Sequence, residues 1–371
     1  MSKQDGKYAT VHYSNYLQLD KILSAQSMRS EQLEETPAHD EMLFIVIHQV
    51  YELWFKQIIH EVTSVVQLFN SHDVDERNIG TAVARLKRVI EIQEVIIKQI
   101  HVLETLTPLD FLDFRNYLFP ASGFQSFQFR MVETLLGLRE EDRITYNNKK
   151  YDSEFTAEQQ TALKNVLQHG TLFDAIEDWL ERTPFLNFGN FKFLEHYKEA
   201  VISMIEKEQR AIRESNYLSD QEKQMRLRML GTTDTFFESI LNEEAHDKMV
   251  KAGSLRLSYK ATLAALLIRV YRDEPILQMP YNLLNNIIEI DELFTTWRYR
   301  HSQMVLRMLG RKIGTGGSSG YDYLHATAVK HHIFWDFHNI STLLIPRSEI
   351  PALPDDLKKE LGFYFTDQKP D

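Results

Sequence analysis

The chain has 371 residues, of which 43% are hydrophobic and 11% aromatic, and its formal net charge is −11. This composition is ordinary for a globular protein with a sizeable core, whereas an acidic chain without a basic cluster is not expected to bind nucleic acid. The sequence contains no cysteine, which excludes disulfides, zinc–thiolate sites and cysteine nucleophiles.

The N-terminal residues up to Tyr8 lack the apolar core of a secretion signal. The best candidate for a membrane span, residues 261–270, is about half the length that a bilayer requires and already contains Arg269. We therefore expect a cytoplasmic protein with no membrane association.

Apolar residues at helical spacing predict a series of helices joined by short turns. The first amphipathic segment covers residues 13–26. Asp40 then resembles the N-cap of a long helix that runs toward Asn70, and a further helix is expected over residues 81–103. Prolines and a glycine divide residues 107–130 into a short helix, a turn and the start of another helix.

The second half of the chain continues the helical pattern but changes in composition. Between about residues 140 and 230 the sequence is more charged, which is typical of a solvated helical lobe. The helices expected after residue 140 cover residues 156–180, 191–229, 263–271 and 283–293, followed by a helix around residue 301. We find no set of strands and no internal repeat. The sequence thus predicts an all-α fold, with residues 1–371 in a single domain that carries a charged helical insertion at about residues 140–230.

Two of these helices each place one histidine on an apolar face. One stripe at helical spacing consists of Phe44, His48, Tyr51 and Phe55, and the other of Phe294, Trp297, His301, Val305 and Met308. A buried imidazole needs a polar partner, and a backbone carbonyl or a hydroxyl often meets that need. Two imidazoles among aromatic residues would also suit a haem, which is flat, largely apolar and held by an axial histidine.

Arg115 and the glycine-rich segment 314–320 allow two interpretations each. Arg115 is either a member of an ion pair, with Asp110 or Asp113 as local partners, or a guanidinium that holds a carboxylate between aromatic residues. The glycine-rich segment is neither a phosphate loop nor a dinucleotide fingerprint. Its composition favours a flexible linker, and the alternative is a loop that packs against a ligand and presents Thr315 to it.

Other motifs give weaker signals. Glu243-x-x-His246 has the spacing of carboxylate di-iron bundles, but no second motif accompanies it, so we interpret it as a chance pairing on the surface. His332 and His338 have no neighbours in the sequence that would complete a metal site. The nucleophile-elbow motif of serine hydrolases is absent as well.

Taken together, segments between about residues 13 and 346 resemble the tryptophan 2,3-dioxygenase family. The matching stretches include His39-Asp-Glu-Met-Leu-Phe-Ile, His48-Gln-Val-Tyr-Glu-Leu-Trp-Phe, Thr107-Pro-Leu-Asp-Phe-Leu-Asp-Phe-Arg115, Pro120-Ala-Ser-Gly-Phe-Gln-Ser, Trp179-Leu-Glu-Arg-Thr-Pro, Trp297-Arg-Tyr and Gly314-Thr-Gly-Gly-Ser-Ser-Gly-Tyr. So many ordered matches are more specific than any single motif. Arg300 departs from the pattern, in which we expect an asparagine, and so does the region around residues 329–335.

The resemblance implies a cytoplasmic, homotetrameric enzyme with one haem b per subunit. Such an enzyme cleaves the C2–C3 bond of the indole ring of L-tryptophan with O2 and forms N-formyl-L-kynurenine, the first step of tryptophan breakdown by the kynurenine pathway. By position, His301 is similar to the proximal iron ligand, and His48 to the catalytic distal histidine beside the indole N–H.

The resemblance also implies roles for other residues. Arg115 is similar to the clamp for the substrate carboxylate, and Thr315 to the hydroxyl that meets the amino acid's charged groups. The apolar wall would consist of Phe44 and Phe111, the segment that reaches a neighbouring subunit's site would contain Tyr13 and Tyr16, and the haem contacts would be Ser122, Arg130 and Trp297. The alternatives are an indoleamine 2,3-dioxygenase-like enzyme and a non-catalytic haem-binding gas sensor, which would have no need of an amino-acid clamp.

Overall fold

A computed structural model describes residues 10–34, 36–70, 76–145, 150–310, 312 and 320–362. Over these residues the chain is mainly helical, which confirms the all-α prediction. The strands in this part of the chain are β1 (Asn187–Phe188) and β2 (Phe191–Lys192), which form a short antiparallel pair.

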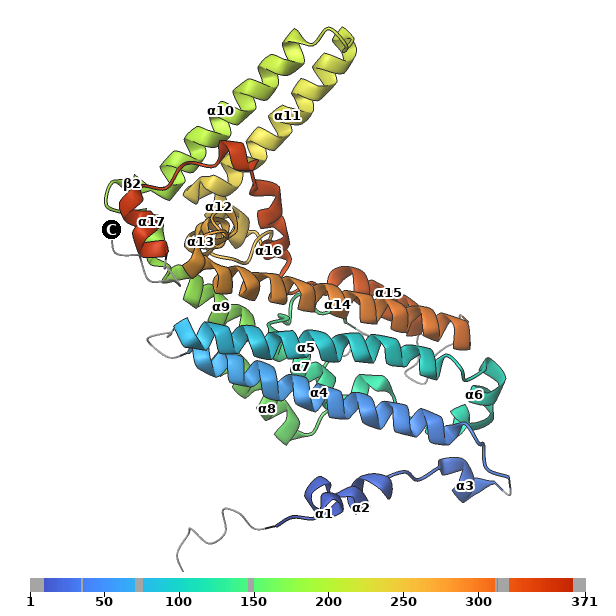
Figure 1. The fold of residues 1–371 in the computed structure, drawn as a ribbon. Coiled ribbons are helices and arrows are strands. Elements are labelled where there is room, and N and C mark those ends of the chain that lie inside the picture. Colours follow the sequence, from blue (N-terminus) through green and yellow to red (C-terminus); the bar gives the residue numbers. More distant parts are fainter. Residues whose placement is uncertain are drawn as a thin grey trace, which may run out of the picture.

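Long helices lying side by side form the body of the molecule (Figure 1). Helix α4 (Glu41–Phe69) packs against α5 (Glu76–Leu103), which in turn packs against α14 (Gln278–Leu309). Asp40 is the N-cap of α4 and Asn70 its C-cap, as the sequence predicted. The separate helices expected over residues 283–293 and around residue 301 are in fact the single helix α14.

Shorter helices surround these three. They are α1 (Tyr13–Leu17), α2 (Leu19–Leu23), α3 (Arg29–Leu33), α6 (Pro108–Arg115), α7 (Phe127–Leu136), α8 (Ala157–His169), α9 (Leu172–Glu181), α12 (Glu243–Lys251), α13 (Tyr259–Val270), α15 (Gly320–Lys330), α16 (Trp335–Asn339) and α17 (Asp355–Leu361). The 3-10 turns are η1 (Asn116–Leu118), η2 (Gly123–Gln125), η3 (Pro184–Leu186), η4 (Pro275–Leu277), η5 (Ile340–Leu343) and η6 (Arg347–Glu349). The helix expected over residues 13–26 is divided at Gln18, whose φ of 54° lies in the left-handed region.

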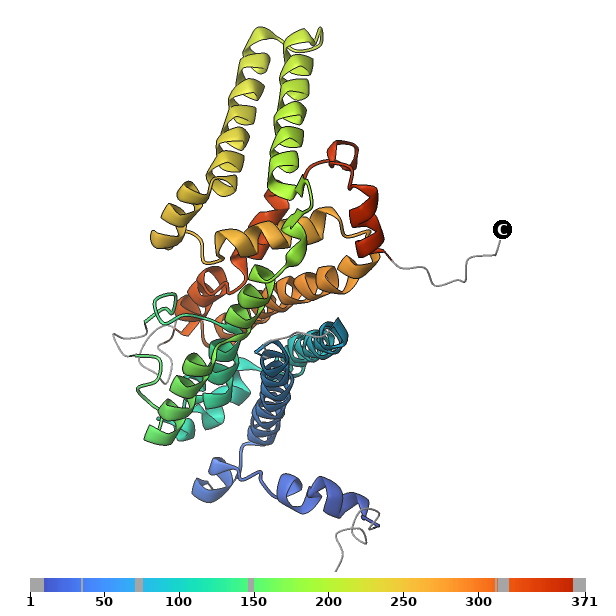
Figure 2. The same ribbon diagram turned by 90° about the vertical axis from the view of Figure 1, so that its left-hand side faces the viewer.

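The charged region between residues 140 and 230 contributes to two parts of the structure. Helices α10 (Phe193–Glu214) and α11 (Asp220–Leu241) form an antiparallel pair that projects from the body (Figures 1 and 2). Helix α9, in contrast, packs against α4 and α13 and buries Leu172 and Ile176 in the core. The division of the chain into one domain with an insertion stays a prediction.

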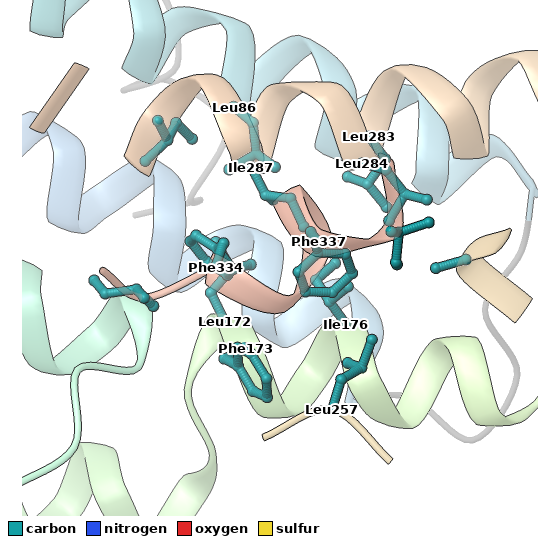
Figure 3. Packing of buried hydrophobic residues seen from close by; sticks show 14 of the residues in the cluster. Leu86, Leu172, Phe173, Ile176, Leu257, Leu283, Leu284, Ile287, Phe334 and Phe337 are labelled. Carbon is teal, nitrogen blue, oxygen red and sulfur yellow. The ribbon is translucent and has the colours of Figure 1, made fainter. Parts of the chain in front are cut away.

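Aromatic and aliphatic side chains from distant parts of the sequence meet in the core (Figure 3). Phe334 and Phe337, at the start of α16, lie close to Phe173 of α9, with both ring centroids 6.1 Å from that of Phe173. Leu86 of α5 and Ile287 of α14 are fully buried in the same cluster. Burial of these large side chains provides the main driving force that holds the long helices together.

Helix α4 is long and apolar enough to cross a membrane by length and composition. The core helices of soluble proteins pass the same test, and α4 packs against α5, α7 and α9 in the bundle. Its buried residues, among them Phe55, Ile58 and Val62, repeat at helical spacing along the side that these neighbours cover. These contacts account for the apolar residues on the covered side of α4.

Candidate active site

His48 lies on α4 one turn after Phe44, and its ring centroid is 4.1 Å from that of Phe44. Its Nδ1 is 2.6 Å from the backbone oxygen of Phe44. Because a carbonyl can only accept a hydrogen bond, this contact places the proton on Nδ1 and leaves the lone pair on Nε2. His48 is exposed, not buried as its apolar stripe predicted, yet the surrounding protein removes enough water to lower its pKa. His48 is therefore a neutral acceptor near pH 7.

His301 lies on α14, one turn after Trp297, with the two ring centroids 5.3 Å apart. Burial, together with the nearby His48, lowers its pKa to about 4. The ring is therefore neutral near pH 7 and has a lone pair for a metal. Its Nδ1 is buried and has no hydrogen-bond partner among the described residues. Tyr51, one turn after His48 on α4, has its ring centroid 6.1 Å from that of Trp297, so the segments that carry His48 and His301 lie in one region.

Trp297 is enclosed by aromatic rings from two other helices. Its centroid is 5.1 Å from Phe129 of α7 and 6.1 Å from both Tyr51 and Phe55 of α4. Tyr51 is itself fixed by a hydrogen bond of 2.9 Å from its hydroxyl to the backbone oxygen of Ile96. Close packing of this kind restricts rotation of the indole. The aromatic layer thus fixes the turn of α14 that carries His301 and makes its surroundings apolar.

Helix α6 brings the predicted substrate residues to the same region. Thr107 and Asp110 form a reciprocal capping box at its start, and Pro108 occupies the first turn. Phe111 stacks on Phe44 with centroids 5.7 Å apart. Arg115 follows Phe111 by four residues and therefore lies on the same side of α6; it is half-buried. Phe44 thus contacts both His48 and Phe111, and Arg115 lies one turn further along α6.

A buried cluster of charges lies where α7 meets α14. The Glu133 carboxylate accepts hydrogen bonds from Arg130 Nη1 at 2.8 Å, Arg143 Nη1 at 2.8 Å and Arg298 Nη2 at 2.9 Å. Burial alone would raise the pKa of Glu133, but Arg130, His331, Arg143 and Arg298 outweigh it and hold that pKa well below its usual range. Because burial lowers the pKa of His331, its imidazole adds no charge near pH 7. Three guanidinium groups therefore face one carboxylate.

Tyr323 links the segment of Ser122 to Arg130 in this region. Arg130 is buried, its Nε has no partner among the described residues, and its guanidinium interacts with Tyr323 of α15. Ser122 accepts a hydrogen bond of 3.4 Å from the backbone N–H of Phe124, whose ring is 4.9 Å from that of Tyr323. The loop after η1 and helix α15 thus meet next to Arg130.

Several predicted residues are not brought into this site. Tyr13 and Tyr16 on α1 are 71% and 73% exposed, and Thr315 lies outside the described residues. The interpretation of His246 as a surface residue was wrong. Its side chain is fully buried on α12, where Nε2 lies 3.2 Å from the Thr262 hydroxyl, so the residue has a role in packing.

The sequence analysis missed three contributors to this region. Glu133 lies within the segment Phe127-Gln-Phe-Arg-Met-Val-Glu133, where an ionisable pair three residues apart among apolar residues could have indicated buried charge. Arg298 is not part of the apolar stripe that contains His301, yet it is buried against Glu133. Tyr323 gave no signal in the sequence. Among the described residues, no group of three or more His, Asp or Glu side chains is arranged to hold a metal ion.

Comparisons with known proteins agree on one family. Residues 1–344 match the family described as Tryptophan 2,3-dioxygenase. The chain is 48% identical to a protein of that name from Bdellovibrio bacteriovorus over 97% of this chain and 100% of the relative. It is 44% identical to a protein of the same name from Alteromonas mediterranea, over 95% of this chain and 97% of the relative. It is also 44% identical to a protein of that name from Xenopus laevis, over 94% of this chain and 86% of the relative.

Proposed function

This chain belongs to the tryptophan 2,3-dioxygenase family, and on that premise we propose that His301 is the axial ligand of one haem b per subunit, with His48 on the opposite side. The enzyme uses O2 to cleave the C2–C3 bond of the indole ring of L-tryptophan and forms N-formyl-L-kynurenine. The observation that carries the haem assignment is the contact between Tyr51 of α4 and Trp297 of α14, which brings the segments of His48 and His301 together among aromatic rings. When bound, ferrous haem supplies the electrons that activate O2.

The residues around His301 fit a haem. A neutral imidazole is the form that ligates iron, and the aromatic layer around Trp297 suits a flat apolar ring. Haem also carries two propionate carboxylates, which need cationic partners. The excess of guanidinium groups around Glu133, together with the unpartnered Nε of Arg130, favours Arg130 as such a partner, with Tyr323 beside it and Ser122 as a further haem contact.

The substrate would lie between His48 and helix α6. Phe44 and Phe111 offer an apolar wall to the indole ring. His48 Nε2 has a lone pair to accept the indole N–H, because Nδ1 is committed to the backbone oxygen of Phe44. Arg115 would hold the carboxylate through a bidentate pair, and Thr315 would meet a charged group of the amino acid. These contacts hold the ring in one orientation and exclude water from it.

Replacement of His301, the proposed iron ligand, tests the haem assignment. We expect His301→Ala, purified after expression with added haem, to lose the ferric and ferrous Soret bands of the parent protein. The matched control is His325→Ala, because His325 also stacks against aromatic rings, at 5.5 Å from Tyr321 and 6.1 Å from Tyr299, and has no proposed contact with iron. An unchanged Soret spectrum in His301→Ala would contradict the assignment.

The substrate analogue tryptamine tests whether Arg115 holds the carboxylate of L-tryptophan. This analogue lacks the carboxylate that Arg115 would hold, so we expect it to be a very poor substrate. Comparable values of kcat/KM for tryptamine and L-tryptophan would remove Arg115 from this role. A non-catalytic gas sensor, the alternative from the sequence, is not favoured, because the relatives described above are named as enzymes.

The enzyme would work as a cytoplasmic homotetramer. Exposed apolar residues on the N-terminal arm, including Tyr13, Tyr16 and Leu23, support a role for this arm in covering a neighbouring subunit. Native mass spectrometry should give four times the 43.6 kDa mass of one chain. A monomer at micromolar concentration would contradict this assembly.

A further inference from the structure

Arg300 is the residue before His301, but its side chain points to a different neighbour. Its Nη2 is 3.3 Å from Glu104 Oε2, 3.4 Å from Glu104 Oε1 and 3.3 Å from His101 Nδ1. Successive helical residues are about 100° apart around the axis, so Arg300 reaches α5 while His301 faces the site. Arg300 therefore forms an ion pair between α14 and Glu104, the residue that follows α5.

Glu104 connects the Arg300 contact to α6, the helix that carries Phe111 and Arg115. It directly follows α5, its side chain is 16% exposed, and only two residues separate it from Thr107, the N-cap of α6. The short connection is held by backbone hydrogen bonds from Thr105 to Val102 and from Leu106 to Leu103, and Leu106 is buried. Helix α6 also contacts α14 directly. A change in the position of Glu104 would therefore shift the start of α6.

We propose that the Arg300–Glu104 ion pair is a positioning device that sets the orientation of α6, and through it the position of Arg115, relative to the helix that carries His301. This inference rests on the proposed roles of Arg115 and His301. Arg115 is at the far end of α6, about 12 Å from its start, so a tilt of about 5° would move it by about 1 Å. Displacements of that size are large enough to weaken substrate binding.

The test compares Arg300→Met, Glu104→Gln and the double variant in a double-mutant cycle on the haem-loaded enzyme. We expect each single variant to raise KM for L-tryptophan about two- to fivefold, as befits a partly exposed ion pair, with kcat changed by less than about twofold. The double variant should resemble the single ones, because either change already removes the interaction. Soret bands should stay unchanged. Hydrogen exchange of the amides of residues 106–115, measured without substrate, should become faster.

The chain offers a matched control farther along the same two helices. Lys87 of α5 and Glu289 of α14 form a pair with a Nζ–Oε1 distance of 4.0 Å. If the Arg300 pair acts on α6, Lys87→Met and Glu289→Gln should change neither KM nor hydrogen exchange of residues 106–115. Equal effects from both pairs would indicate general loosening of the α5–α14 contact and would overturn the proposal.

Arg115→Lys separates failure of this inference from failure of the proposed clamp. If Arg115→Lys raises KM while Arg300→Met and Glu104→Gln leave it unchanged, the clamp stands and the positioning role is wrong. If Arg115→Lys also leaves KM unchanged, the clamp itself is wrong. Effects of Arg300→Met and Glu104→Gln that add in the double variant would likewise overturn the proposal, because the two side chains would then act independently.

Discussion

Replacement of Glu133 by glutamine provides a direct test of the buried charge cluster. Arg130, Arg143 and Arg298 are 8%, 4% and 3% exposed and share this one carboxylate, itself 2% exposed. Glutamine has almost the same shape but no charge, so three buried guanidinium groups would lose their counter-ion. Breaking a buried ion pair by removal of one partner costs about 3–5 kcal/mol. For a chain of this size that cost corresponds to a fall in melting temperature of roughly 4–6 °C.

The free energy of unfolding, measured in urea at pH 7 for parent and variant, checks this magnitude. Glu195→Gln is the matched control, because the Lys192–Glu195 pair has a similar distance of 2.9 Å but side chains that are 56% and 63% exposed, and its loss should change stability by less than about 1 kcal/mol. The pKa of Glu133 is lowered in the folded protein, so its contribution is full above the unfolded pKa of about 4.3 and is lost as pH falls through the lower folded value. If Glu133→Gln costs less than about 1 kcal/mol at pH 7, the argument from buried charge is wrong.

Three further outcomes follow from individual contacts. His48→Ala should lower kcat about tenfold without abolishing turnover, because a hydrogen bond that orients the indole is lost but no obligatory base; absence of turnover in a variant that still binds haem and L-tryptophan would contradict this. Gly137→Ala should cost about 1–3 kcal/mol, since φ is +115° and the new Cβ would lie 2.8 Å from Phe173 Cβ; Gly170→Ala, at φ +89° with open space around it, should cost less. Burial lowers the pKa of His246, so the free energy of unfolding of the parent protein should fall as pH drops below about 6.5, where the unfolded chain binds the proton more readily. His246→Leu should reduce the difference between the free energies of unfolding measured in urea at pH 5 and at pH 7.5. An unchanged difference would refute the role of His246.

Much of the fold could be predicted from hydrophobic periodicity, because long amphipathic helices repeat their apolar residues many times. The N-cap position of α4 and the burial of Tyr51, Phe55 and Phe294 are local properties of a helix, and the structure has them as expected, whereas His48 is exposed. Helix boundaries were harder to predict, because single residues there carry little periodic signal. Gln18 divides one expected helix into two, and two expected helices form the single helix α14.

The sequence by itself determined which residues could carry the chemistry: two neutral imidazoles on apolar helix faces, an arginine among aromatic rings, and an order of motifs typical of one family. Only the tertiary structure decided which charges meet. Glu133 and Arg298 are 165 positions apart, and Arg300 and Glu104 are 196 apart, so no local pattern links them. Charged residues on a helix are usually solvated, and their burial depends on which neighbour covers that face. Because the packing of the whole chain determines that neighbour, these ion pairs can be identified only in the folded protein.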